Sequence, residues 1–175
     1  MSHGGAGGVP DDDVGVDAAV FRGAIGRLAA GVAVIAIRWR GTDHAMTASA
    51  VTSVSLDPAL LLFCVHVDAR FRDALDDVDL WTVSVLSDTA GPVADWFASP
   101  GRPAVDQLAR IAHTRAPRSG AAWIADAAAW FECRTTEIHR AGDHDIVVGT
   151  VLEAHQGPAS AGGLVHHRGR TRGLV

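Results

Sequence analysis

The sequence predicts a mainly β protein, a closed or nearly closed antiparallel β-barrel with short helices at its periphery. Three observations predict this fold class. Runs of β-branched and other apolar residues outnumber the helical patterns. Short polar turns join neighbouring runs as hairpins, and the few helical segments fall at irregular places instead of alternating with strands. The 175 residues are enough for one domain with a single core.

The first half of the chain supplies one helix and three strands. Asp17 is expected to cap a helix of helically spaced apolar residues that ends near Gly31. A β-branched strand over 32–40 then turns at 41–44 and returns as a strand over 45–55. After Asp57-Pro58, the continuous apolar run 60–67 is typical of a strand buried on both faces.

The second half continues the pattern, with one irregular section. The spacing predicts a helix over 70–78, a strand over 80–86, and a short helix over 93–98 with Trp96 and Phe97 turned inward. Residues 100–129 contain several Pro and Gly and are predicted as a long surface loop with a little helix. The last predicted elements are strands over 130–140 and 145–155 around the turn 141–144, then a strand over 164–168.

Composition narrows the classes of function. Hydrophobic residues make up 48% of the chain and charged residues 20%, which predicts a folded protein. The net charge of −5 argues against a phosphate-backbone interface, so we expect no nucleic acid partner. All basic side chains other than His are Arg, and Tyr is absent, which excludes a lysine Schiff base and a tyrosine acid. The apolar runs are too short to span a bilayer.

The two cysteines and the N-terminal residues bear on location. Cys64 and Cys133 lie far apart in apolar runs, which favours buried reduced thiols over a disulfide or a zinc site. Residues 1–16 are rich in Gly and Asp and lack the pattern of a secretory signal. We therefore expect a disordered tail over 1–16, a folded domain over 17–175, a cytoplasmic location and no metal site.

Hydroxyl side chains recur at every second position of the strand expected over 45–55. Thr47, Ser49, Ser53 and Ser55 would share one face of that strand. Such a row suits the oxygen atoms of a nucleotide or the polar edge of a flat heterocycle. The same row also fits the solvent face of a half-buried strand, and spacing alone leaves both interpretations open.

The turn Gly142-Asp143-His144 also has two interpretations. Gly permits positive φ, and Asp bonds its own backbone, as in many hairpin turns. Alternatively, the turn holds His144 rigidly at a strand entrance beside a ligand, where its charge would depend on its neighbours.

Four segments together resemble the short-chain flavin reductase family, the FMN-binding split-barrel proteins that supply reduced flavin to two-component monooxygenases. The resemblance covers residues 18–170 and rests on Phe21-Arg22-Gly23 through Gly31-Val32-Ala33-Val34-Ile35, Ala45-Met46-Thr47-Ala48-Ser49 through Asp57-Pro58, Gly142-Asp143-His144 through Gly149-Thr150-Val151, and Leu164-Val165-His166-His167-Arg168-Gly169. It implies a split-barrel homodimer that binds FMN or FAD near the subunit interface.

The resemblance also implies the site residues. His144 would lie on the nicotinamide side as the catalytic residue, and Arg70 or Arg72 would bind the phosphate. The family's hydroxyls are missing at Ala69 and Phe71. The implied flavin-binding residues are Ala45, Met46, Thr47, Ala48, Ser49, Ala50, Ser55, Cys64, Arg70, Arg72, Arg168 and Gly169.

The activity implied is that of an NAD(P)H-dependent flavin reductase, with FMN or FAD as flavin, NADH or NADPH as hydride donor and a flavin-dependent monooxygenase as partner. Two alternatives remain open. One is a split-barrel flavin-binding module without reductase activity of its own, which the missing hydroxyls favour. The other is an oxidase of the pyridoxamine-phosphate type, against which the Gly-Asp-His segment argues.

Overall fold

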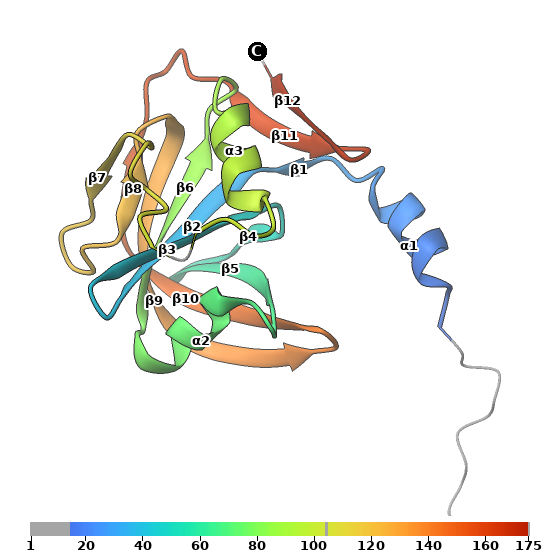
Figure 1. Ribbon diagram of the computed structural model, residues 1–175, viewed down its shortest axis with the longest axis horizontal. Helices are drawn as coiled ribbons and strands as arrows, with labels where there is room; N and C mark the ends of the chain where they lie inside the picture. The colour runs from blue at the N-terminus through green and yellow to red at the C-terminus, as the bar shows by residue number, and fades with distance from the viewer. Residues whose placement is uncertain (1–14, 104, 175) are drawn as a thin grey trace, which may run out of the picture.

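The computed structural model describes residues 15–103 and 105–174, so most of the tail expected over 1–16 lies outside the described residues. A seven-stranded antiparallel sheet forms the body (Figure 1), which confirms the mainly β prediction. In spatial order its strands are β3 (Thr42–Ala48), β2 (Ala33–Trp39), β6 (Leu80–Leu86), β9 (Ala127–Ala141), β10 (His144–Gln156), β5 (Ala59–His66) and β4 (Val51–Leu56).

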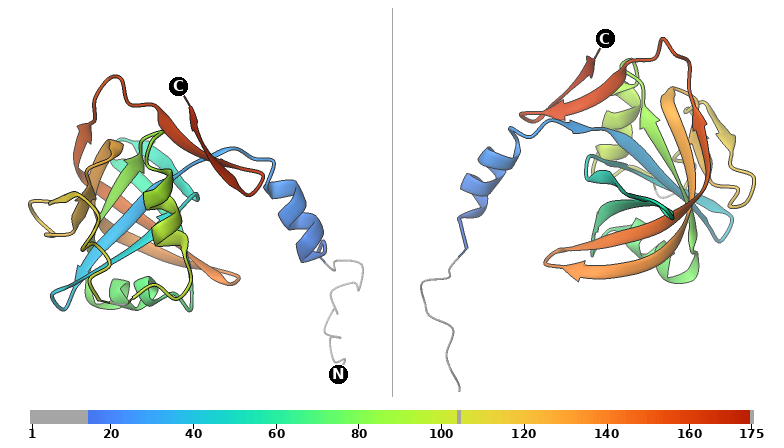
Figure 2. Two further views of the ribbon diagram at one scale, coloured as in Figure 1. Left: turned by 45° about the horizontal axis from the view of Figure 1, so that its top comes forward. Right: turned by 180° about the vertical axis from the view of Figure 1, so that it is seen from behind.

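The sheet curls around its core without closing a ring of hydrogen bonds (Figure 2). β3 and β4 are its two edges, although they are consecutive in the chain. The seven described strands therefore form an open sheet, and a closed barrel is not confirmed.

The strand predicted over 45–55 is wrong, because the chain breaks it in two. β3 pairs with β2 and ends at Ala48, and β4 begins at Val51 and pairs with β5. In the sequence, hydroxyl residues recur at every second position on both sides of the break, so periodicity alone does not locate the change of partner. The hydroxyl row is consequently divided: Thr47 lies on β3, Ser49 in the connection, and Ser53 and Ser55 on β4.

The β2–β3 turn also differs from the prediction. It consists of Arg40 and Gly41, whose φ angles are 50° and 78°, rather than residues 41–44. Positive φ at both central residues suits the right-handed twist of a two-residue hairpin, and Gly adopts it without strain. The β9–β10 turn lies at the predicted place, with Gly142 at φ 66°.

Two hydrophobic clusters lie on opposite faces of β2. Ile35 and Ile37 join the cluster around Phe63 and Trp81, and Val34 joins the cluster around Phe97. The strand buried on both faces is thus β2. In β5, which the sequence predicted to have that role, Phe63 and Val65 are buried but the residues on the other face are only half-buried.

Two of the predicted helices cover the body. α2 (Arg70–Asp77) buries Phe71 and Leu75 against the first cluster, as expected from its helical spacing. α3 (Gly91–Ala98) buries Phe97 against the second cluster. Trp96 is not turned inward: it is 37% exposed, and its Nε1 donates to the carbonyl of Gln107 at 2.9 Å.

The section over 100–129 contains a hairpin instead of the expected helix. β7 (His113–Arg115) pairs with β8 (Ala122–Ile124), and no α-helix occurs among the described residues of this section. The buried side chain of Thr82 on β6 donates to the carbonyl of Ala122 at 2.7 Å, which fixes this hairpin to the sheet.

The N- and C-terminal elements lie together beside the body (Figures 1 and 2). α1 (Ala18–Ile25) is capped by Asp17 as predicted, but it ends before Gly31. A small sheet joins β1 (Ala30–Gly31), β11 (Gly163–His167) and β12 (Arg170–Leu174), and β12 was not predicted. Among the described residues, no helix combines the length and the apolarity needed to cross a bilayer.

Candidate functional site

A cavity of about 840 Å³ opens between the edge strand β3, the start of α2 and the segment that follows α3. Each of these elements contributes for a local reason. β3 has a free edge because it is the last strand of the sheet. α2 begins directly after β5, so the β5–α2 connection borders the same space. The lining residues are His44, Ala45, Met46, His66, Asp68, Ala69, Arg70, Phe71, Asp73, Ala98, Pro100, Gly101, Arg102 and Gln107.

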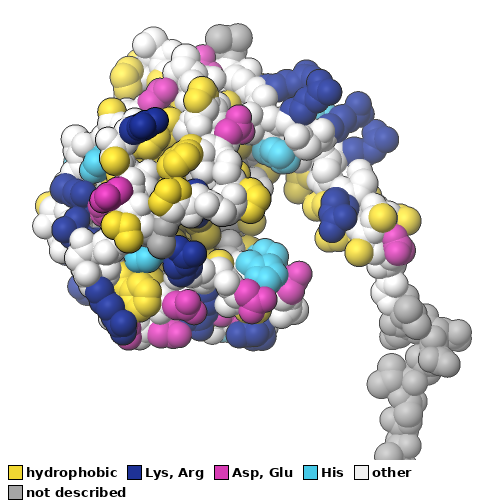
Figure 3. All heavy atoms as spheres, viewed as in Figure 1, with side chains coloured by type: hydrophobic (Ala, Val, Ile, Leu, Met, Phe, Trp, Pro, Cys, Tyr) yellow, Lys and Arg dark blue, Asp and Glu magenta, His cyan; other side chains and the backbone are white. Residues whose placement is uncertain are grey.

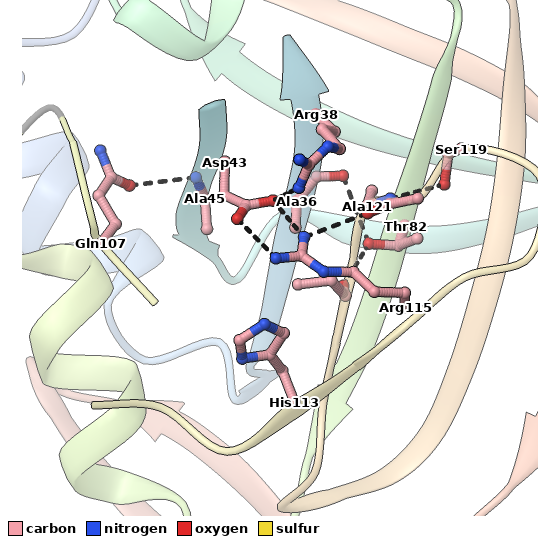
Figure 4. A network of polar contacts seen from close by, with 12 residues as sticks. Ala36, Arg38, Asp43, Ala45, Thr82, Gln107, His113, Arg115, Ser119 and Ala121 are labelled. Carbon is pink, nitrogen blue, oxygen red and sulfur yellow. Dashed lines mark hydrogen bonds and ion pairs between the residues drawn. The ribbon is translucent and has the colours of Figure 1, made fainter. Parts of the chain in front are cut away.

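The backbone of Ala45 is held by two side chains from the segment after α3. The Ala45 N–H donates to Oε1 of Gln107 at 3.2 Å (Figure 4). The Ala45 carbonyl accepts from Nη2 of Arg102 at 2.6 Å. Sequence reasoning missed both side chains, because they lie in an irregular segment with no periodic pattern. These two side chains satisfy the backbone hydrogen-bonding groups of Ala45 on the edge strand β3. The resemblance assigns this part of β3 to the flavin-binding site.

Arg70 and Arg102 both line the cavity, and the charge of Arg70 affects two neighbouring side chains. Burial, followed by the charge of Arg70, lowers the pKa of Arg102. Burial and the same Arg70 charge lower the pKa of His44, and Asp43 opposes this effect. The charge of one cation, Arg70, therefore disfavours the protonation of both neighbours.

His144 lies near this cavity but does not line it. It is the residue opposite His66 in the β5–β10 pair, and the two rings meet edge to face with centroids 5.2 Å apart. His66 is the member of the pair that lines the cavity. Nδ1 of His144 lies 2.7 Å from Oδ1 of Asp143, and this hydrogen bond lowers the pKa of the Asp143 carboxyl.

The two candidate phosphate-binding arginines have different surroundings. Arg70 lines the cavity. Arg72, two residues further along α2, pairs with Asp145 on β10 and with Asp76 at 2.6 Å. Asp145 is 2% exposed and also accepts from Nε of Arg140 at 2.6 Å. Arg72 therefore links α2 to the sheet and is not among the residues that line the cavity.

Thr47 and Ser49 open onto a second, smaller cavity of about 270 Å³ beside α3 and the terminal sheet. Met46 and Thr47 reach different cavities because successive side chains of a strand point to opposite faces. The hydroxyl of Thr47 donates to the carbonyl of Ala94 at 2.6 Å, and Gly169 borders the same space. Arg168 and Gly169 also border a cavity of about 360 Å³ next to α1.

The remaining candidate residues line none of these spaces. Ala48 is buried, Ala50 is exposed, and the hydroxyl of Ser55 accepts from the N–H of Asp57. Cys64 is half-buried on β5, and burial raises the pKa of its thiol. Cys133 is fully buried, as predicted, and its pKa is raised to about 12 by burial and by the nearby Glu132. Both cysteines are free thiols.

Phe71 explains one departure from the family pattern. Its ring is 4% exposed and meets Phe63 edge-on at 6.0 Å between centroids, so it belongs to the core as well as to the cavity wall. A hydroxyl at this position would replace core packing.

Comparisons with known proteins agree with this geometry. The family model described as "Flavin reductase like domain" matches residues 25–174. The chain is 37% identical over 153 residues to the NADH-dependent FMN reductase AsuE2 of Streptomyces nodosus subsp. asukaensis, covering 85% of this chain and 80% of that protein. It is also 37% identical over 150 residues to the NADH-dependent FAD reductase of Streptomyces globisporus, covering 85% and 81%.

Solved structures show that the fold is similar as well as the sequence. BorF, the flavin reductase component of a bacterial two-component tryptophan halogenase, superposes with a TM-score of 0.85 at 40% identity, covering 90% of this chain and 98% of that one. The NADH:FAD oxidoreductase SgcE6 of Streptomyces globisporus, in complex with NAD and FAD fragments, gives 0.84 at 32% identity, covering 97% and 98%. The matched length, the identities and the shared fold together show that this chain belongs to the flavin reductase-like domain family.

Proposed function

We propose that this protein is an NAD(P)H-dependent flavin reductase that provides reduced FMN or FAD to a partner oxygenase. The observation that carries the proposal is the cavity at the free edge of β3, which is lined by Arg70 and Arg102 and lies in a chain of this family. Relatives named as NADH-dependent FMN and FAD reductases support the reaction, and they favour NADH as the hydride donor.

The reaction makes modest demands on the side chains. When both are bound, nicotinamide and flavin supply the chemistry, a hydride transfer between their rings. The protein binds them, orients them and supplies fixed dipoles for the charge of the reduced ring. This division of labour suits a chain without Lys or Tyr.

The proposed roles follow the positions of the residues. Ala45 and Met46 lie where the flavin ring would contact β3, and Arg70 is favoured over Arg72 as a phosphate ligand because Arg72 is already paired with two carboxylates. His144, with His66 between it and the cavity, is proposed to act on the nicotinamide side. Thr47, Ser49 and Gly169 are proposed to border the flavin from the smaller cavity.

We also propose a split-barrel homodimer. The open sheet with edges β3 and β4 supports the split-barrel description. The dimer is supported by α1, which has no buried residue within this chain and exposes Phe21 and Ile25. A cytoplasmic location, in keeping with two free thiols, remains a prediction. A relative named as the reductase component of a 4-nitrophenol monooxygenase of Rhodococcus opacus supports an oxygenase as the partner.

The test is an assay of NADH and NADPH oxidation with and without FMN, FAD or riboflavin. We expect oxidation only when a flavin is added. His144→Ala should raise the KM for NADH about tenfold, a loss of about 1.4 kcal/mol, and leave flavin binding unchanged. His139→Ala, an exposed histidine on the same hairpin, is the matched control.

Two outcomes would change the assignment. Tight flavin binding without any oxidation of NADH or NADPH would favour the flavin-binding module. An unchanged KM and kcat in His144→Ala would remove this histidine from the site.

A further inference from the structure

His66 and His144 come from two different strands and lie side by side next to the larger cavity. They are directly opposite each other in the β5–β10 pair, so their side chains lie on the same face of the sheet. Their rings meet edge to face with centroids 5.2 Å apart, and His66 lines the cavity. Both side chains remain open to solvent, with exposed fractions of 47% and 44%. A ligand that contacts His66 therefore finds the ring of His144 beside it.

A local hydrogen bond fixes the tautomer of the neutral His66 ring. Its Nδ1 accepts from the backbone N–H of Asp68 at 3.1 Å. The carboxylate of Asp68 lies 3.9 Å from the same nitrogen, which is beyond hydrogen-bond distance. A ring nitrogen that accepts a hydrogen bond carries no proton, so the proton of the neutral ring is on Nε2. His66 therefore offers an N–H donor to a ligand.

The neutral His144 ring has the opposite tautomer. Its Nδ1 lies 2.7 Å from Oδ1 of Asp143, and this bond lowers the pKa of the Asp143 carboxyl, which is therefore ionised at neutral pH. An ionised carboxylate can only accept, so Nδ1 of His144 carries the proton and donates it to this bond. The Nε2 of the neutral ring is then unprotonated and acts as an acceptor.

The two rings together present one donor and one acceptor. Neither Nε2 has a hydrogen-bond partner within residues 15–103 and 105–174. A primary carboxamide carries the complementary groups, because its carbonyl oxygen accepts and its NH2 group donates. The nicotinamide ring of the hydride donor has such a carboxamide.

We propose that His66 and His144 together recognise the carboxamide of the nicotinamide ring. His66 donates from Nε2 to the carbonyl oxygen, and His144 accepts at Nε2 from the NH2 group. His66 is then a specificity-determining residue of the reaction. The inference rests on the proposed function and adds to it the chemical group by which the hydride donor is recognised.

The alternative is that the two rings only pack against each other and support the β5–β10 pair. Loss of packing would affect every ligand of the cavity in the same way. Loss of a donor or an acceptor would affect only those ligands that carry the complementary group. A ligand that lacks one of the two carboxamide groups therefore distinguishes the two roles.

The experiment is a calorimetric titration of the full chain, saturated with FMN, with NAD⁺ and with its 3-acetylpyridine analogue. Both ligands are oxidised, so neither transfers a hydride during the measurement. The analogue keeps the carbonyl oxygen but has a methyl group in place of NH2, so it loses only the contact with His144. The wild-type protein should bind NAD⁺ about tenfold more tightly than the analogue, the effect of one hydrogen bond. Inhibition constants against NADH give the same comparison where the affinity is too weak for calorimetry.

The two histidines should respond differently to substitution. His144→Ala should weaken NAD⁺ about tenfold and leave the analogue unchanged, so that the preference for NAD⁺ disappears. His66→Ala should weaken both ligands about tenfold, so that the preference remains, and His66→Gln, which keeps an N–H donor, should restore most of the affinity. His139→Ala, at an exposed position on the β9–β10 hairpin, should change neither affinity. Fluorescence quenching should show unchanged FMN binding in all four variants.

A preference for NAD⁺ that survives in His144→Ala, or unchanged affinities in His66→Ala, would overturn the inference. Equal weakening of NAD⁺, the analogue and FMN would overturn it in favour of packing. If circular dichroism shows that an alanine variant is unfolded, His66→Phe and His144→Phe are measured instead, because Phe keeps an aromatic ring and removes both nitrogens.

Failure of the inference differs from failure of the proposed function. A wild-type protein that oxidises NADH but binds NAD⁺ and the analogue equally would overturn only the carboxamide site. A folded wild-type protein that oxidises neither NADH nor NADPH with any flavin would overturn the proposed function itself.

Discussion

Asp145 joins three elements through two guanidinium groups. It lies on β10, and its carboxylate accepts from Arg72 on α2 and from Arg140 on β9. The hydrogen bond from Arg72, followed in effect by that from Arg140, lowers the pKa of Asp145 even though removal from water raises it. The residue type alone does not reveal this role, because an Arg after a buried strand fits a phosphate ligand equally well.

This arrangement predicts a pH-dependent stability. Folding lowers the pKa of Asp145, so the ionised carboxylate stabilises the folded state. This stabilisation is complete at pH values above the pKa of the unfolded state, about 3.9, and it is lost as the pH falls through the lower pKa of the folded state. Asp145→Asn should therefore reduce the free energy of unfolding at pH 7, and the difference from wild type should narrow below about pH 4. Urea unfolding of both proteins at several pH values measures this difference in the free energy of unfolding.

Asp95→Asn, at an exposed position on α3, serves as the control and should change stability little at any pH. A difference between Asp145→Asn and wild type that stays constant from pH 7 to about pH 3, well below the usual carboxyl pKa, would contradict the role given to the carboxylate charge.

At the scale of elements, the β9–β10 hairpin depends on close contact at Gly149. The register between these strands shifts next to this residue. A Cβ built there would lie 2.5 Å from Cζ2 of Trp81 and 2.9 Å from the carbonyl oxygen of Arg134. Trp81 is fully buried against Phe63, with ring centroids 4.8 Å apart, so it has little room to move. The close packing of β6 on this hairpin requires Gly149.

Gly149→Ala should consequently overpack the core and lower the free energy of unfolding by about 1–3 kcal/mol. Gly91→Ala is the matched control, because a Cβ there meets nothing within 4 Å and its φ is not positive. Thermal or urea denaturation of both variants measures the difference. Equal stability of the two variants would show that Trp81 can shift to accept the methyl group.

Most elements were predicted from periodicity, and the errors have identifiable physical causes. β6, α2 and the β9–β10 hairpin follow the pattern because each has one clearly apolar face. The break between β3 and β4 was missed because the alternation continues through it. β7 and β8 were missed because short strands that are held by contacts with the body have little periodic signal of their own.

At the scale of the whole molecule, α1 stands apart from the body (Figure 1) with its apolar side chains exposed (Figure 3). Phe21 is 56% exposed, and no residue of this helix is buried. A helix of eight residues is too short to be stable by itself in water, so its apolar side chains are expected to need a partner. A second copy of the chain is the partner that we propose.

The triple variant Val20→Ser, Phe21→Ser and Ile25→Ser should therefore be monomeric under conditions in which the wild-type protein is a dimer. Sedimentation velocity measures the association state. Val105→Ser, which changes an exposed apolar residue away from α1, should leave the dimer intact. A monomeric wild-type protein, or a triple variant that still dimerises, would exclude this interface.

The sequence by itself determined the antiparallel β class, most element positions and the resemblance that leads to flavin chemistry, because apolar periodicity and turn residues act over a few neighbouring positions. Only the tertiary structure decided which residues meet. It placed Arg70 with Arg102 in one cavity, paired Arg72 of α2 with Asp145 of β10, and directed Thr47 and Met46 to different cavities. These placements depend on contacts between residues far apart in the chain, and no local pattern carries that information.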